Sequence, residues 1–263
     1  MHPIMDLAQV ISGFAVGAIV GITGVGGGAL MTPLLVLLFG IAPATAVGTD
    51  LLYAAITKSG GTWVHARRGN VDWSLVGLLA AGSLPAAAAT LLLVARLAPQ
   101  GLGGAARTIT LALGIALLLT AAALLWRRRL QAWAQARAAQ SLSAARRRGL
   151  TVLTGAVLGA LVALSSVGAG ALGVTALFFL YPRLTAIRIV GADLAHAVPL
   201  TLLAGLGHWW LGSIDWPLLG SLLAGSLPGI FLGSHLAQRI PESLLRPTLA
   251  GMLVLVGGKL ISA

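Results

Sequence analysis

The chain contains two copies of one sequence unit, and this duplication limits the possible folds more than any other feature. The stretch from Val47 to Pro85 returns without a gap as Val190 to Pro228. The paired positions include a Gly-x-Asp motif, a histidine, an Asp-Trp pair and a Gly-Ser-Leu-Pro motif. A repeat of this kind has to be recognised before any other feature is interpreted. The two copies are therefore expected to fold alike.

The composition is that of a membrane protein. Hydrophobic residues make up 58% of the 263 residues and charged residues 9%, whereas about 25% of an average soluble protein is charged. Several nearly uncharged runs have the roughly 18 residues that a helix needs to cross a hydrocarbon core about 30 Å thick. The 35 glycines fit this interpretation, because small residues let membrane helices approach closely. We predict an all-α membrane protein with several crossings.

Each copy is predicted to hold one apolar run broken by glycines and three uninterrupted transmembrane helices. The first broken run extends from Leu7 to Phe39 and is interrupted at Gly24–Gly28. The second is interrupted at Ser166–Gly170, between apolar runs at 151–165 and 171–180. The uninterrupted spans are expected near residues 46–64, 73–95, 108–126, 187–210, 216–237 and 244–261. The domain boundaries follow: a first transmembrane repeat over 1–126, a basic linker over 127–149 and a second repeat over 150–263.

The number of crossings predicts that the two repeats have inverted topologies. Each half crosses three times if its broken run is a re-entrant hairpin and five times if both legs cross, and both numbers are odd. The positive-inside rule agrees, because the loop before Asp72 is basic and its counterpart at 212–214 is not. The arginines that decide this are Arg67 and Arg68 in the first half and Arg183, Arg188, Arg239 and Arg246 in the second. Two parallel repeats of four spans each remain the alternative.

The linker carries much of the net charge of +11. Seven arginines lie between Arg127 and Arg148, with no acidic residue among them, which is typical of a cytoplasmic loop. We expect a solvated tether there, and the alternative is a helix lying on anionic lipid. No folded basic domain is present to bind nucleic acid. The N-terminus lacks the basic segment of a cleavable signal peptide, so the run from Leu7 is expected to be retained.

The two glycine breaks are the predicted substrate site. A helix that starts at such a break presents unpaired amide groups and the positive end of its dipole, which suits an anion. Inverted repeats with paired broken helices are typical of secondary transporters that bind substrate where the repeats meet. The predicted substrate-binding residues are Thr23, Gly24, Gly26, Gly27, Gly28, Thr32, Ser165, Ser166, Gly168 and Gly170. The alternative is that these glycines only allow close helix packing.

Four further residues are candidates for coupling or gating. Asp50 and Asp193 occupy equivalent positions inside apolar segments, where a carboxylate is costly and is by default a candidate proton or ion relay. They can also be interpreted as acids in the first turn of their helices. Lys58 lies two turns after Asp50 and can pair with it or contact substrate, or extend to the membrane interface. His196 lies inside a span and is a candidate proton relay.

The remaining motifs are predicted to be structural. Asp72-Trp73 and Asp215-Trp216 have the form of a helix-start acid followed by a tryptophan anchor at the interface. The chain has no cysteine, no metal-ligand cluster, no nucleophile with a base and no nucleotide-binding loop. We therefore expect no cofactor, no bound metal and no enzymatic activity.

Several of these stretches together resemble the sulfite exporter TauE/SafE family of membrane permeases. They are the first glycine break followed by TPLLVLLFG, AVGTDLLYAAITKSGGTWVH, GNVDW, VGADLAHAVPLTLLAGLGHWWLGSIDWPLL and GSLPGIFLGSHLAQRIP. The resemblance covers nearly the whole chain except the linker. It implies a multi-pass permease of the bacterial inner (cytoplasmic) membrane that moves sulfite, organosulfonates or related small anions outward. The aspartates of GTD and GAD stand where many relatives have a hydroxyl residue.

The leading hypothesis is a secondary transporter that exports a small oxyanion, coupled to protons or to the membrane potential. The alternative is a cation or metal transporter with Asp50 and Asp193 as ligands, although six acidic residues in the chain are a poor supply of oxygen ligands. The expected partners are the anionic substrate and membrane lipid. A homodimer is compatible with the sequence.

Overall fold

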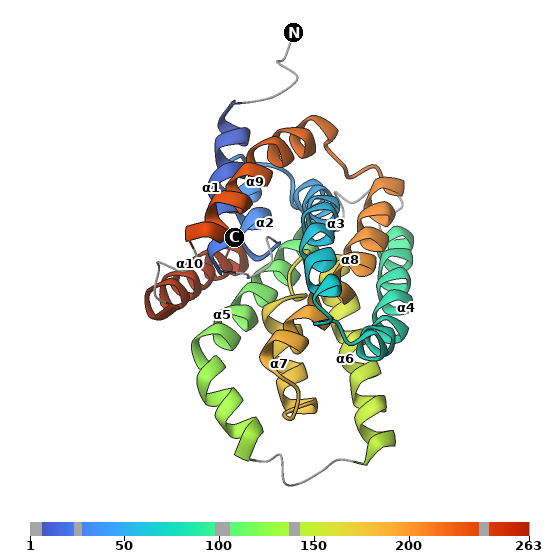
Figure 1. The fold of residues 1–263 in the computed structure, drawn as a ribbon. Helices are drawn as coiled ribbons and strands as arrows, with labels where there is room; N and C mark the ends of the chain where they lie inside the picture. Colours follow the sequence, from blue (N-terminus) through green and yellow to red (C-terminus); the bar gives the residue numbers. More distant parts are fainter. Residues whose placement is uncertain (1–6, 24–27, 98–105, 137–142, 237–241, 263) are drawn as a thin grey trace.

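A computed structural model of the chain describes residues 7–23, 28–97, 106–136, 143–236 and 242–262. This part of the chain is a bundle of α-helices (Figure 1). The first half contains α1 (Leu7–Thr23), α2 (Gly28–Leu37), α3 (Pro43–Arg67), α4 (Trp73–Leu97) and α5 (Ala106–Ala136). The second half contains α6 (Ala144–Ser165), α7 (Ala171–Leu180), α8 (Ala186–Trp210), α9 (Trp216–Leu236) and α10 (Glu242–Ser262).

The all-helical membrane architecture predicted from composition is confirmed. Among the described residues, five helices are long and apolar enough to cross a membrane: α4, α6, α8, residues 107–127 of α5 and residues 216–233 of α9. In contrast, α2 and α7 have only 10 residues each, or about 15 Å at 1.5 Å per residue, which is half of a hydrocarbon core. Each half thus consists of two helices next to a predicted break, followed by three further helices of 21 residues or more.

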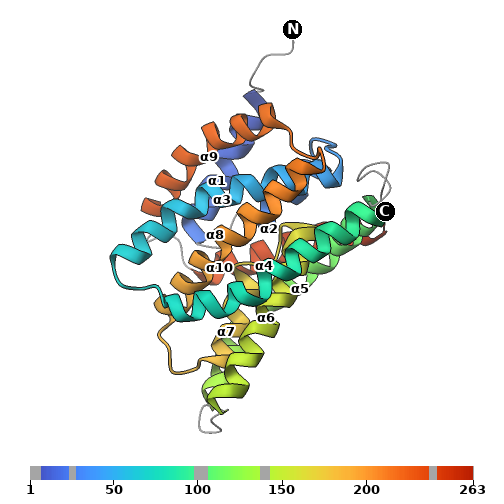
Figure 2. The ribbon, with the colours of Figure 1, turned by 90° about the vertical axis from the view of Figure 1, so that its right-hand side faces the viewer.

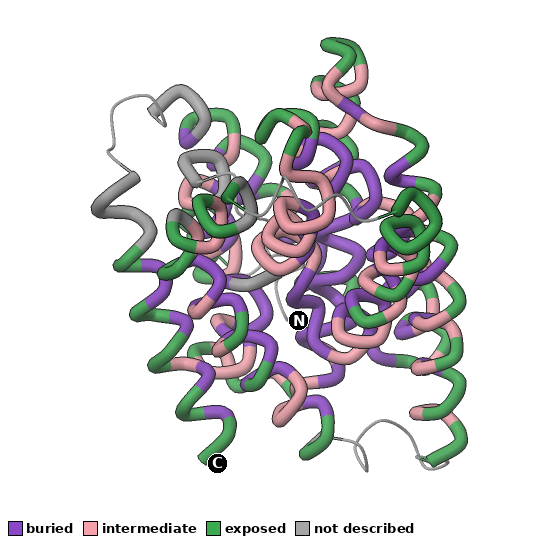
Figure 3. Tube along the Cα trace, turned by 90° about the horizontal axis from the view of Figure 1, so that it is seen from below, coloured by how far each residue is buried: buried purple, intermediate pink, exposed green. Residues whose placement is uncertain are grey.

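The outer surface of the bundle carries many apolar side chains, and several polar residues are buried inside it. Figure 3 shows most of the buried residues towards the centre of the bundle and most of the exposed ones around its outside. Exposed apolar side chains on the long helices include Leu93, Leu119, Val157 and Phe231. Apolar side chains exposed on so many helices are expected in a protein surrounded by lipid and not in one surrounded by water.

The two halves exchange equivalent contacts. Helix α1 packs along α9, where a Cβ added to Gly13 would lie 2.6 Å from the Leu222 carbonyl oxygen. The equivalent helices α6 and α4 pack in the same way, where a Cβ on Gly155 would lie 2.2 Å from the Leu79 carbonyl oxygen. One turn further, Gly17 meets Ser226 and Gly159 meets Ser83. Glycine therefore allows backbone-to-backbone packing at both interfaces, and each interface joins one half to the other.

The equivalent helices α3 and α8 lie side by side in the middle of the bundle and run in opposite directions (Figures 1 and 2). Gly48, near the start of α3, packs against Ser213, just beyond the end of α8. Gly191, near the start of α8, packs against Asn70, just beyond the end of α3. Further along the two helices, Gly61 near the end of α3 packs against Leu194 near the start of α8. Gly205 near the end of α8 packs against Leu52 of α3, so these contacts also show that the helices are antiparallel.

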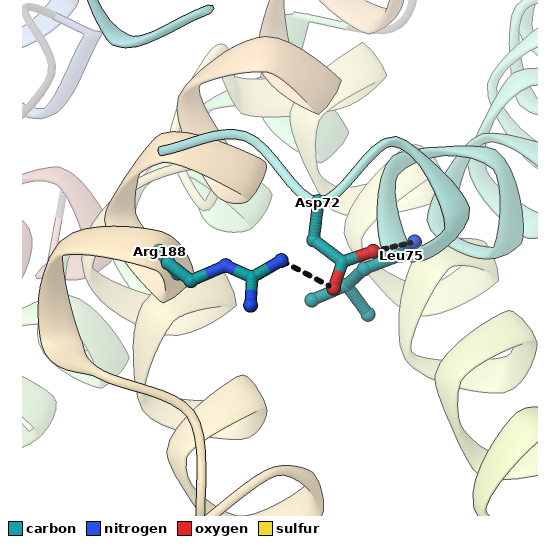
Figure 4. A network of polar contacts seen from close by, with 3 residues as sticks. All are labelled: Asp72, Leu75 and Arg188. Carbon is teal, nitrogen blue, oxygen red and sulfur yellow. Dashed lines mark hydrogen bonds and ion pairs between the residues drawn. The ribbon is translucent and has the colours of Figure 1, made fainter. Parts of the chain in front are cut away.

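The two Asp-Trp motifs begin helices α4 and α9, as predicted. Asp72 Oδ1 accepts a hydrogen bond from the Leu75 N–H at 3.2 Å, and Asp215 Oδ1 accepts one from the Leu218 N–H at 2.9 Å. These are N-cap bonds, which satisfy amide groups that have no partner within the helix. Asp72 also forms an ion pair of 3.4 Å with Arg188 at the start of α8 (Figure 4).

The linker differs from the expected tether, because helix extends into it from both sides. Helix α5 continues to Ala136 and α6 begins at Ala144, so their linker ends extend below α7 in Figure 1. The extension of α5 is rich in arginine, alanine and glutamine and that of α6 in alanine and arginine, which are good helix formers. Ser143 caps α6 by accepting a hydrogen bond from the Arg146 N–H. Trp133, in the extension of α5, packs edge-on against Phe179 of α7 at 5.7 Å between ring centroids.

Candidate functional site

The second predicted break connects α6 to α7 and lies inside the bundle. Helix α6 ends at Ser165, and Ser166 is in the left-handed region with φ 57°. Gly168 and Gly170 follow with φ 133° and 126°, conformations that glycine adopts far more readily than other residues. Ser165, Ser166 and Val167 are all buried. A non-glycine residue with positive φ inside a membrane bundle is unusual enough to point to a functional segment.

The two serines of this break differ in their hydrogen bonds. Ser165 Oγ bonds to the Leu161 and Val167 carbonyl oxygens and accepts from the Val167 N–H. Its hydroxyl is thus used by local backbone. Ser166 Oγ is buried without a hydrogen-bond partner among the described residues, although it lies beside the Asp50 carboxylate. Ser166 is therefore the better candidate for contact with a ligand.

Asp50 is fully buried in α3 and is held by a hydroxyl group. It is the eighth residue of its helix, so the prediction that it caps the first turn is wrong. Thr32 Oγ1, from α2, donates a hydrogen bond of 2.5 Å to Asp50 Oδ2. Asp50 Oδ1 is buried without a partner among the described residues. The side chain thus joins α2 to α3 and keeps one oxygen available inside the bundle.

Asp193 occupies the equivalent position in α8 and lies at the start of α7. It is also the eighth residue of its helix, and it is 3% exposed, so a role as a first-turn cap is wrong here too. Its carboxylate interacts with the Gly170 N–H and packs so closely on Gly173 that a Cβ there would overlap Oδ1. Asp193 Oδ1 has no hydrogen-bond partner among the described residues. The carboxylate therefore lies where the amide groups of α7 have no helical acceptor.

Lys58 points into the bundle between the two acids. It is 7% exposed, so the alternative that it extends to the membrane interface is wrong. Its Nζ donates one hydrogen bond, of 3.5 Å, to the Ala169 carbonyl oxygen in the break. The ammonium lies near both Asp193 and Asp50, but no lysine–carboxylate ion pair within 4.0 Å occurs among the described residues. Lysine has three donors, and two of these have no acceptor in the described part of the chain.

His196 lies one turn after Asp193 and bonds to α4. Its Nε2 forms a hydrogen bond of 2.7 Å with Ser83 Oγ, and both side chains are fully buried. The equivalent residues in the other half are Tyr53 and Ser226, and the Tyr53 hydroxyl is buried without a hydrogen-bond partner among the described residues. Both pairs lie where α3 and α8 cross the helices of the Gly-Ser-Leu-Pro motifs.

The structure thus brings together Thr32 of α2, Asp50 and Lys58 of α3, Asp193 of α8, and Ser166 and Gly170 of the break between α6 and α7. His196 and Ser83 lie next to this group. Of the first-half break, Gly24, Gly26 and Gly27 lie outside the described residues, as do the side-chain surroundings of Thr23 and Gly28. Their predicted role stays a prediction.

Sequence reasoning missed Ser83 and Gly173 as parts of this region. Ser83 was visible only as one letter of the repeated Gly-Ser-Leu-Pro motif. Gly173 has no repeat-equivalent glycine, because Met31 occupies that place in the first half. No residue pattern indicated that Gly173 would pack against a carboxylate. Among the described residues, no group of three or more His, Cys, Asp or Glu side chains is placed to hold a metal ion.

Comparison with known proteins agrees with this picture of a membrane transporter. Residues 9–260 match the family described as Sulfite exporter TauE/SafE. The chain is 40% identical over 257 residues to the probable membrane transporter protein YjnA of Bacillus subtilis (strain 168), an alignment that covers 98% of this chain and 100% of YjnA. It is 28% identical over 252 residues to YdhB of the same organism, also named a probable membrane transporter protein, covering 92% and 97%.

A probable membrane transporter protein of Xylella fastidiosa (strain 9a5c) is 26% identical over 234 residues, which covers 88% of this chain and 85% of the relative. No solved structure gives a significant match. The family match spans almost the whole chain, and it confirms the resemblance seen in the motifs around both breaks. The chain belongs to the sulfite exporter TauE/SafE family of membrane transport proteins.

Proposed function

We propose that this protein is a secondary transporter, and not an enzyme, that exports a small anion such as sulfite or an organosulfonate across the cytoplasmic membrane of a bacterium. Transport proceeds by alternating access around a site between the two broken helices. The observation that carries this proposal is the buried polar group at the start of α7. There Lys58, the Ser166 hydroxyl and the Gly170 N–H supply donors inside an otherwise apolar bundle. Donors gathered at a helix start suit an anion.

The proposed mechanism rests on inverted repeats. Because α3 and α8 are equivalent in sequence yet run in opposite directions, an inverted relation accounts for their packing, whereas two parallel repeats would orient them alike. The ion pair between Asp72 and Arg188 brings the loop after α3 next to the start of α8. The end of α3 and the loop after it carry Arg67 and Arg68, and the loop before α8 carries Arg183. The positive-inside rule therefore assigns both of these basic loops to the cytoplasm.

Cysteine labelling tests the inversion, because the chain has no native cysteine. Arg68 and Leu211 are equivalent C-cap residues of α3 and α8. In spheroplasts, a membrane-impermeant maleimide should label Leu211→Cys but reach Arg68→Cys and Arg183→Cys only after permeabilisation. Equal labelling of Arg68→Cys and Leu211→Cys from one side would show parallel repeats and defeat the inverted mechanism.

A cation or metal transporter that uses Asp50 and Asp193 is the rival function. Both acids are buried and each has one oxygen without a described partner, which is the observation in its favour. Against it, Lys58 interacts electrostatically with both acids, and a fixed positive charge between two carboxylates repels a cation. The anion proposal explains the lysine, which the rival does not.

Flux through proteoliposomes separates the two functions. Vesicles loaded with sulfite or methanesulfonate should release the anion only when they contain the protein, at a rate that does not depend on which alkali cation is present. Ser166→Ala removes the unpaired hydroxyl and is expected to weaken the apparent affinity for the anion several-fold. Flux that follows the cation and ignores the anion would refute the proposal.

A further inference from the structure

Asp193 lies where the proposed function puts the substrate. Its carboxylate lies near the Gly170 N–H at the start of α7, against Gly173, and near the Lys58 ammonium. These are the same groups that an anion at this helix start would contact. Asp50, its equivalent, is instead held by the Thr32 hydroxyl on α2. The two acids are therefore not alike: one is bonded to a neutral side chain, and the other sits among the donors of the candidate anion site.

Glycine at position 173 makes this placement of Asp193 possible. A Cβ at Gly173 would lie about 2 Å from Asp193 Oδ1, far inside van der Waals contact. The first half has Met31 at this position, so the first-half helix does not offer the same close approach. Two features of the second half, the glycine at 173 and the amide of Gly170, thus surround this carboxylate together with Lys58 of the first half.

We propose that Asp193 acts as an internal anion that occupies the substrate position in the unloaded protein, and that Lys58 is the residue that binds the transported anion. This inference deepens the proposed function and rests on it. The substrate displaces the Asp193 carboxylate from the Gly170 amide and from the field of Lys58. Its oxygens then accept hydrogen bonds from the Lys58 ammonium, the Ser166 hydroxyl and the Gly170 N–H.

Charge balance then requires a proton to bind with each anion. Before binding, the position holds one negative charge, that of the Asp193 carboxylate. A substrate anion in the same low-dielectric space adds a second, and two like charges at this range repel each other strongly unless one is neutralised. A proton from water binds the displaced carboxylate to form the carboxylic acid, and the negative charge of the position is unchanged. The anion and the proton are released together on the other side.

Few other charged groups face Asp193. Lys58 is on α3, Asp50 lies two turns before it on the same helix, and His196 is one turn along α8 and bonded to Ser83 of α4. Helices α6 and α7 contribute a hydroxyl and backbone groups in the described part of this region. Asp193 is thus the carboxyl group that a bound anion displaces most directly.

The test uses methanesulfonate in proteoliposomes that contain a pH-sensitive dye. A sulfonate stays ionised over the whole working range, so any proton that moves with it is carried by the protein. In the unaltered protein, a methanesulfonate gradient should drive proton movement in the same direction. Asp193→Asn should still exchange methanesulfonate across the membrane but lose the proton signal at least tenfold. Lys58→Gln should lower exchange itself at least tenfold.

Matched controls are available outside the site. Lys259 is the chain's other lysine and is exposed on α10, and Asp72 is a cap at a helix end, so Lys259→Gln and Asp72→Asn should keep both signals. Full proton movement in Asp193→Asn, or loss of the proton signal in Asp50→Asn alone, would overturn the inference. Unchanged exchange in Lys58→Gln would do the same.

A binding measurement separates failure of this inference from failure of the proposed function. Sulfite and methanesulfonate should raise the melting temperature of the detergent-solubilised protein, and Lys58→Gln should abolish that shift. A shift that depends on Lys58 without any flux would support the site and refute transport of these anions. Flux with a shift that survives Lys58→Gln would keep the proposed function and refute the assignment of Lys58. No shift and no flux would refute both.

Discussion

The centres of α3 and α8 share one backbone framework but differ in chemistry. Each helix has an aspartate as its eighth residue, and each begins with a glycine contact to the far end of the other. Around that framework, however, Lys58 of α3 corresponds to Thr201 of α8, and Tyr53 corresponds to His196. The glycines near the two helix starts, Gly48 and Gly191, are the same in both halves, whereas these two positions near the polar centre are not.

This difference separates the scaffold from the site. Positions that bring helices together are constrained equally in both halves, because each interface joins one half to the other and has an equivalent partner. The residues of a site formed between the halves need not be the same in both halves, because one charged side chain from either half can interact with residues of both. One lysine between two acids is the simplest arrangement of this type, and it gives two similar carboxylates different surroundings.

The largest predicted effect tests whether the α4–α6 and α1–α9 interfaces are equivalent. A Cβ on Gly82 would lie within 2 Å of the Val152 carbonyl oxygen, and a Cβ on Gly225 equally close to that of Val10. Gly82→Ala and Gly225→Ala should each destabilise the protein by about 3 kcal/mol or more, since backbone has to move in both. Melting temperatures in detergent, measured by size exclusion after heating, give the comparison.

The matched controls are Gly77→Ala and Gly220→Ala. These two glycines are also equivalent, lie on the same helices, and have no atom within 4 Å of an added Cβ. Both substitutions should leave the melting temperature unchanged or slightly higher, because alanine favours helix. A large effect at Gly82 with none at Gly225 would mean that the two interfaces are not equivalent.

The second effect tests the difference between the acids. Thr32→Val removes the hydroxyl that donates to Asp50 while keeping the side-chain shape, and Val174 already occupies the equivalent position in the second half. A buried carboxylate that loses its donor costs about 1–3 kcal/mol. Thr32→Ser should restore most of the stability, because it returns the hydroxyl. Equal stability of Thr32→Val and the unaltered protein would mean that Asp50 does not depend on this bond.

The helices and their bounds could be predicted from the sequence, because apolar runs and Asp-Trp motifs depend only on neighbouring residues. The repeated glycines in addition indicated where helices pack closely. The start of α4 at Trp73, the start of α9 at Trp216 and the bounds of α7 were all predicted. The helical ends of the linker were not, because a run of arginines indicates where the chain lies in the membrane more clearly than whether it is helical.

The surroundings of the candidate site could be predicted only in part. Asp50, Lys58 and Asp193 were identifiable because charges are rare in apolar segments. Their partners were not, because the approach of Lys58 to Ala169 joins residues 111 positions apart. Which carboxylate receives a hydroxyl and which receives a backbone amide depends on how α2 and α7 pack against α3 and α8. No local pattern contains that information.

A third, smaller effect compares the serines of the two Gly-Ser-Leu-Pro motifs. Ser83 Oγ bonds His196 at 2.7 Å, whereas the hydrogen bond of Ser226 Oγ is to the Leu223 carbonyl oxygen of its own helix at 3.5 Å. Ser83→Ala should cost about 1–2 kcal/mol, because it leaves a buried imidazole nitrogen unpaired. Ser226→Ala should cost a few tenths of a kcal/mol by the same measure. Equal melting temperatures for the two variants would show that the His196 bond contributes nothing to stability.

The smallest effect concerns the two helix caps. Asp72→Ala and Asp215→Ala each remove one N-cap bond and should cost about 1 kcal/mol. Asp72→Ala also removes the ion pair with Arg188, in which the arginine side chain is 44% exposed, and such a pair contributes at most about 1 kcal/mol and is screened by salt. The two alanine variants should therefore differ by a few tenths of a kcal/mol at low salt and converge in high salt. Arg188→Gln alone should reproduce that small difference. A difference in stability that persists in high salt would mean that Asp72 has a role beyond its cap and its ion pair with Arg188. The equivalent caps Asp72 and Asp215 would then differ in their roles, as the centres of α3 and α8 do.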